Sequence, residues 1–149
     1  MGADLYINSL YQPQLRKWEP KFEKAARLRD SLKPGTEEHR RAQAHVEKCY
    51  EKMYERGYFR DPYNDNDLLW KFGLSWWTDV IPMLDGEGQL SVEKAAGLLA
   101  LLKQRDNIFQ LNLAQLPASE RKSFLDRYAK LQKFLNDAIE LGSPIDASL

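Results

Sequence analysis

The spacing of apolar residues is helical over most of the chain and strand-like only near its start. Residues 3–8 alternate polar and apolar side chains, and this pattern predicts a short extended segment. From Leu15 to Leu32, apolar side chains recur every three or four positions and form one stripe along a predicted helix. Pro20 lies inside this stripe, so we expect either a kink there or a helix that begins near Glu19.

A second helix is predicted directly after the turn formers of residues 33–35. Thr36 is a good N-cap, and the two glutamates that follow it suit the positive end of a helix dipole. The two helices should form an antiparallel hairpin, and Gly57 should close the second one. The predicted inner face of the second helix consists of Ala42, Val46, Cys49, Tyr50, Met53 and Tyr54. The predicted outer face alternates Glu47, Glu51 and Glu55 with Lys48, Lys52 and Arg56, which is typical of an ion-paired solvent face.

The second half of the chain predicts three more helices. The first begins near Asn64 and is split at Gly73, with Ser75 capping its second part and Pro82 limiting it. The next helix follows Ser91 as its N-cap. After a predicted loop over residues 110–118, the last helix ends at Gly142 and Pro144. Its predicted buried face consists of Phe124, Leu125, Tyr128, Leu131, Leu135, Ala138 and Ile139.

These patterns predict an all-α fold. The 149 residues, 43% of them hydrophobic, suit a single helical domain over 1–149 with one core. We expect about five helices in an irregular bundle with a short N-terminal extended segment. The lone Cys49 excludes an intramolecular disulfide, and the first residues resemble no secretory leader, so a cytoplasmic location is the expectation.

Charge is balanced overall and uneven along the chain. Lys plus Arg and Asp plus Glu both total 22, so no net field favours nucleic acid or a membrane surface as a partner. Residues 61–93 hold seven acidic side chains against Lys71 alone, which gives this segment a net charge of −6. This acidic segment is either an ordinary solvated surface or a binding surface for a basic partner.

Residues 83–94 carry the pattern of a calcium loop in their middle. With Gly88 at the invariant glycine, oxygen ligands fall at Asp85, Glu87, the Gln89 carbonyl and Ser91. The loop resembles the EF-hand family over this stretch only, and it departs from the family at both ends. Met83 stands at position one and Lys94 at position twelve, where the family has a carboxylate. The resemblance implies a weak calcium site, and the alternative is a turn between helices that needs no metal.

Aromatic side chains crowd into the same acidic segment, where Trp70, Phe72, Trp76 and Trp77 follow one another closely. Adjacent tryptophans point about 100° apart on a helix, so both are buried only if the helix is covered on two sides. The rings are therefore either core or, in the case of Trp70 and Trp77, exposed anchors for a partner.

No pattern of catalytic residues stands out in the sequence. His45 and Cys49 share one helical face, but two ligands are too few for a metal, so a packed thiol is the expectation. We therefore expect no enzyme and no obligatory cofactor. The favoured hypothesis is a non-catalytic protein-interaction module that binds another protein with a basic surface, and the alternative is a weak calcium-binding protein. The predicted partner-binding residues are Asp61, Asp65, Asp67, Trp70 and Trp77.

Overall fold

The computed structural model describes residues 1–64 and 67–149. By its internal contacts the chain divides into two compact units, Asn8–Tyr58 and Met1–Ile7 with Phe59–Leu149. We call them the hairpin unit and the sheet unit and describe each by itself. That the whole chain folds as one domain stays a prediction.

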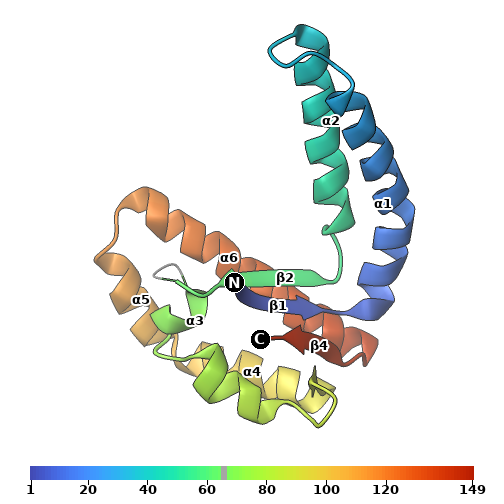
Figure 1. The fold of residues 1–149 in the computed structure, drawn as a ribbon. Helices are drawn as coiled ribbons and strands as arrows, with labels where there is room; N and C mark the ends of the chain where they lie inside the picture. The colour runs from blue at the N-terminus through green and yellow to red at the C-terminus, as the bar shows by residue number, and fades with distance from the viewer. Residues whose placement is uncertain (65–66) are drawn as a thin grey trace. The chain divides into compact units, whose positions relative to one another are not determined.

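The hairpin unit consists of two long helices, α1 (Asn8–Asp30) and α2 (Glu37–Met53), which pack along each other as predicted (Figure 1). Thr36 caps α2 as expected, because its hydroxyl accepts a hydrogen bond of 3.2 Å from the backbone N–H of His39. The expected helix start near Glu19 is wrong, since α1 begins at Asn8 and runs through both Pro13 and Pro20. Each proline removes one backbone donor, and packing against α2 keeps the helix continuous.

The core of the hairpin unit is small. Ala25, Val46 and Cys49 are buried, and Trp18, Phe22 and Ala26 pack against them while half-buried. Cys49 is a free, buried thiol. The inner-face prediction is wrong at Tyr50, whose side chain is 53% exposed.

Helices also make up most of the sheet unit. Their bounds are α3 (Leu68–Lys71), α4 (Val92–Gln104), α5 (Asp106–Ala114) and α6 (Ala118–Leu141), with a π-helical turn η1 (Trp76–Val80) and a 3₁₀ turn η2 (Ile81–Met83). Ser75 and Ser91 cap η1 and α4 as predicted, and Gly142 ends α6 in the left-handed conformation. Helix α5 lies where a loop over residues 110–118 was expected, because Phe109 and Leu113 are buried one turn apart and fix a helix.

A four-stranded antiparallel sheet corrects the all-α prediction. The chain is 67% helical, so a mainly helical fold is confirmed, but five helices without a sheet do not describe it. The strands are β1 (Gly2–Tyr6), β2 (Tyr58–Pro62), β3 (Gln89–Leu90) and β4 (Ile145–Ser148), in the order β2-β1-β4-β3. β1 is the predicted extended segment, and Leu5 pairs with Ala147 of β4. The two ends of the chain therefore lie side by side in the sheet (Figure 1).

Aromatic rings fill much of the core of the sheet unit. Phe72 and Phe109 stack with 4.2 Å between ring centroids, and Tyr128 meets both rings edge-on. Phe134 of α6 is buried although the sequence pattern missed it, and Leu125 is 45% exposed although burial was expected. The acidic segment, residues 61–93, begins in β2 and ends in the first turn of α4. Between them it includes α3, η1, η2 and β3.

Candidate functional site

The centre of the candidate site is Asp61, a carboxylate on β2 with no exposed surface. Both of its oxygens accept hydrogen bonds of 2.9 Å from the backbone N–H of Leu68, at the start of α3. Oδ2 also accepts a bond of 2.7 Å from the indole Nε1 of Trp76, and Arg127 of α6 forms an ion pair with Oδ1 at 3.3 Å. One buried charge therefore ties β2 to α3, η1 and α6, because β2 supplies the carboxylate and each of the other three elements supplies a donor to it.

Asp67 lies next to this buried carboxylate and is the N-cap of α3. Its Oδ1 accepts hydrogen bonds from the backbone N–H groups of Leu69, at 2.9 Å, and Trp70, at 3.4 Å. Burial, a hydrogen bond with Asp61 and the charge of Asp61 together raise the pKa of Asp67 to about 7. Asp67 therefore keeps its proton up to near neutral pH, because its charged form would lie buried beside the negative charge of Asp61.

Tyr63 joins this carboxylate pair to an exposed tryptophan. Its ring lies 5.8 Å from the ring of Trp77. Its hydroxyl is buried and has no hydrogen-bond partner among the residues that the structure describes. The pKa of Tyr63 is raised, first by burial and then by the negative charges of Asp67, Asp4 and Asp61. The phenol consequently stays neutral at physiological pH, and its ring packs beside that of Trp77.

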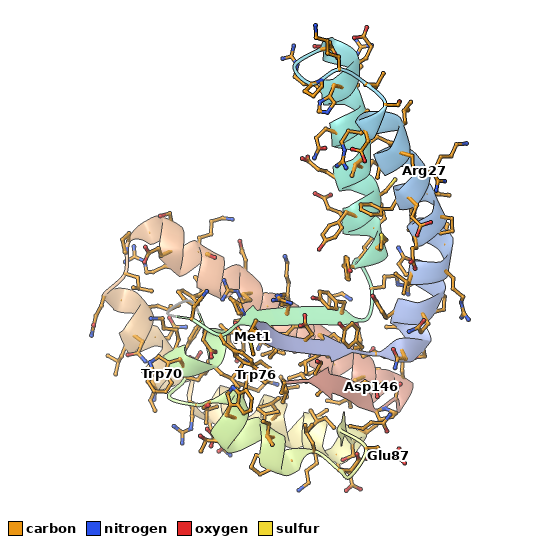
Figure 2. The ribbon with its side chains drawn as sticks, in the orientation of Figure 1. Met1, Arg27, Trp70, Trp76, Glu87 and Asp146 are labelled. Carbon is orange, nitrogen blue, oxygen red and sulfur yellow. The ribbon has the colours of Figure 1, made fainter. Side chains whose placement is uncertain are left out.

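The tryptophans divide into one buried ring and two exposed rings. Trp76 is 0% exposed, whereas Trp70 and Trp77 are 67% and 55% exposed. Figure 2 shows Trp76 within the body of the sheet unit and Trp70 on α3 at its margin. Of the two adjacent residues at the start of η1, Trp76 therefore belongs to the core and Trp77 to the surface.

Cations near the acidic segment are already engaged. The ammonium group of Lys71 lies 5.3 Å from the centre of the Phe124 ring, and the guanidinium of Arg127 lies at the same distance from that ring. Arg127 also pairs with Asp61, and Arg105 donates to the carbonyl of Gly73 at 3.5 Å. These contacts direct the cationic side chains toward the protein rather than toward Trp70 and Trp77.

The calcium-loop residues hold a turn together with their own oxygens. Asp85 Oδ1 accepts from the backbone N–H groups of Glu87 and Gln89, at 2.9 and 3.0 Å. The Gln89 carbonyl accepts from Asp85 N–H at 2.9 Å, and the Ser91 hydroxyl accepts from Lys94 N–H at 3.2 Å as the cap of α4. Glu87 is exposed at the outer edge of the turn (Figure 2). This bonding favours the turn interpretation, and the weak calcium site stays a prediction.

The predicted partner-binding residues differ in their exposure. Asp67, Trp70 and Trp77 are accessible, and Asp67 is bonded to the backbone of Trp70. Asp61 does not offer the surface contact that was expected of it, because its charge is used inside the fold. Asp65 lies outside the described residues.

Sequence reasoning missed Arg127, Tyr63 and the role of Trp76. Arg127 is the ion-pair partner of Asp61 although 66 positions separate them, so no local pattern signals the pair. The position of Tyr63 was detectable in the sequence, because it lies between Asp61 and Asp67 in a turn-rich stretch and so has carboxylates on both sides along the chain.

Comparisons with known proteins add no relative from which a function could be transferred. No family model, no curated protein and no solved structure matches the chain. Within residues 1–64 and 67–149, no three His, Cys, Asp or Glu side chains are grouped as a metal site would require. In the same residues no helix has the length and apolar character of a membrane span.

Proposed function

We propose that the chain is a non-catalytic protein-interaction module, in which Trp70 and Trp77 anchor a partner protein that has a basic surface. The observation that carries the proposal is the exposure of these two rings, 67% and 55%, within a segment whose formal charge, counted from the sequence, is −6. Large exposed tryptophans leave apolar area in water, and protein interfaces recover that free energy by burying such rings at their centre.

The backbone that presents the rings is held in place, which favours binding. Asp61 and Asp67 together accept hydrogen bonds from the first N–H groups of α3, so the helix that carries Trp70 is capped twice. Ser75 caps η1 and thereby fixes the backbone at Trp77, because its hydroxyl accepts hydrogen bonds of 3.2 and 3.4 Å from the N–H groups of Trp77 and Thr78. A preorganised ring loses little conformational freedom when a partner covers it.

A basic partner is the complement of this segment. Asp79 accepts a hydrogen bond from the N–H of Ser75 beside Trp77, and Glu87 and Glu93 are exposed further along the segment. Complementary charge raises the association rate and orients the partner, while the rings supply most of the affinity.

The experiment compares the wild-type chain with the double variant Trp70→Ser, Trp77→Ser as immobilised bait. Both side chains are largely exposed, so the variant keeps the fold, which a thermal melt verifies. We expect basic proteins that the wild type retains to be lost with the variant, and to elute from the wild type at raised salt.

The matched control is Leu28→Ser, which removes an apolar side chain of similar exposure, 56%, from the hairpin unit. This variant should retain the same proteins as the wild type. If the double variant retained them equally well, the two rings would not be anchors and the proposal would be wrong.

A further inference from the structure

The hairpin unit has a cleft of its own, of about 500 Å³. Its lining comes from both helices and consists of Phe22, Gln43, Val46, Glu47, Tyr50 and Glu51. The volume falls in the range of about 300 to 1,000 Å³ that ligand-binding clefts occupy. The cleft does not involve Trp70 or Trp77, which belong to the sheet unit.

One side of the cleft is aromatic and exposed. Tyr50 is 53% exposed, and its ring lies 6.0 Å from that of Phe22 and 4.9 Å from that of Tyr54. Val46 is buried at the base of this row. The stem of a long side chain could therefore bury its methylene groups here, against a surface that the fold leaves open.

The other side of the cleft carries two carboxylates without a cation. Neither Glu47 nor Glu51 forms an ion pair within the described part of the chain, and the one side-chain bond to Glu47 comes from the neutral Gln43, at 3.1 Å. On the same helix, by contrast, Glu55 pairs with Lys52 at 2.9 Å. The ion pairing predicted for this face is therefore present at Glu55 but absent, among the described residues, at Glu47 and Glu51 beside the cleft.

Two cations of the hairpin unit, Arg29 and Lys21, are engaged by other groups. Arg29 donates to Gln43 at the edge of the cleft, at 3.0 Å, and its charge is paired with Asp30 at 2.9 Å. The ammonium group of Lys21 lies 4.4 Å from the centre of the Trp18 ring. Tyr50 has no such cation over its ring among the described residues, so the cleft combines an unfilled aromatic face with unpaired negative charge.

We propose that this cleft binds an arginine side chain presented by a basic segment of another protein. The stem of the side chain would lie against Phe22 and Tyr50, and its guanidinium would reach Glu47 and Glu51. Arginine suits the cleft better than lysine, because its planar group both stacks on aromatic rings and donates to two carboxylates. This proposal is independent of the one for Trp70 and Trp77, since it uses different residues of a different unit.

The experiment measures binding of a fluorescein-labelled helical peptide that carries leucine and arginine on one face. A second peptide has citrulline, which is neutral and of the same shape, in place of each arginine. We expect the full-length chain to bind the arginine peptide about fivefold to tenfold more tightly than the citrulline peptide. The variant Glu47→Gln, Glu51→Gln should abolish this preference, whereas Tyr50→Ala should weaken the binding of both peptides.

The matched control is Glu19→Gln, Glu23→Gln, which removes two exposed carboxylates of the same spacing from α1, outside the cleft. It should keep the preference for arginine, and so should Trp70→Ser, Trp77→Ser. Absence of binding, equal binding of the two peptides, or an equal loss in the Glu19, Glu23 control would each overturn the proposal. The proposal would also be overturned if sedimentation showed that the chain associates with itself and that this association covers Tyr50.

Discussion

At the scale of single residues, Asp61 matters most, because one side chain satisfies donors from several elements. A buried carboxylate is stable only when its lone pairs are used and its charge is balanced. Here the N–H of Leu68, the indole of Trp76 and the guanidinium of Arg127 meet both conditions. The residue that charge counting placed on a binding surface is instead the internal support of that surface.

Replacing Asp61 with alanine should destabilise the chain strongly. The variant leaves Arg127 and the indole N–H of Trp76 without their acceptor, and such a loss costs about 3 to 5 kcal/mol. Urea unfolding followed by circular dichroism measures it. Asp126→Ala is the control, because its ion pair with Lys122 is exposed and should change stability by less than about 1 kcal/mol. Equal stability of the two variants would show that the buried network contributes nothing.

Asp67 predicts a dependence of stability on pH. Its pKa in the folded chain, about 7, lies above the ordinary value of 3.8, so folding favours the protonated form. That contribution is complete below the pKa of the unfolded chain and is lost as pH rises through 7. Because Asp67 is only half-buried, solvent screening limits the loss between pH 5 and pH 8 to about 1 to 2 kcal/mol.

The variant Asp67→Asn isolates this effect. Asparagine caps a helix as well as aspartate does but carries no charge to repel Asp61. Urea unfolding at pH 5 and pH 8 should therefore show a smaller fall in stability for the variant than for the wild type. Parallel falls in the two proteins would mean that the protonation of Asp67 does not control the pH dependence of stability.

At the scale of elements, the sequence predicts what local chemistry decides. The caps Thr36, Ser75 and Ser91 and the end of α6 at Gly142 are confirmed, since a cap depends on bonds within one turn. Helix α5 was missed although Phe109 and Leu113 have helical spacing, because one short amphipathic turn is a weak signal. Strand β4 was missed because four residues become a strand only when distant partners pair with them.

The different exposure of the tryptophans on α3 and η1 predicts which of them iodide quenches. Iodide should quench Trp70 and Trp77, which are 67% and 55% exposed, and leave the buried Trp76 unaffected. Trp70→Phe and Trp77→Phe should each reduce the quenchable fraction of the emission, whereas Trp76→Phe should increase it. Emission fully protected from iodide would contradict the exposure of both rings and remove the basis of the proposed function.

At the scale of the whole molecule, the sheet accounts for the main error in the predicted fold class. The opening alternation indicated a strand but not its partners, and those partners come from residues near 60 and near 146. Charge and aromatic content pointed to the segment that carries the two exposed tryptophans, and its role as a binding surface stays a prediction. They could not tell Asp61 from Asp67, because burial is set by Arg127 and Trp76, which lie far along the chain.

Ile145 tests how far stability depends on the sheet. This side chain is 0% exposed, and its residue pairs β4 with Leu90 of β3. Ile145→Ala should lower the free energy of unfolding by about 2 to 5 kcal/mol, as large-to-small changes in a core do. Leu141→Ala, at a side chain that is 54% exposed, is the control and should have little effect. If the two variants were equally stable, β4 would contribute little to the stability of the core.

The pairing of β1 with β4 also affects how the chain folds as it is made. Residues 2–6 are synthesised well before residues 145–148, so the edge of β1 that later pairs with β4 lacks its partner strand until β4 has been made. Ala3 and Leu5, both buried in the finished sheet, are then exposed on a strand with open hydrogen-bonding groups. That interval is when a chaperone would protect the newborn chain, and it ends only when residues 145–148 emerge.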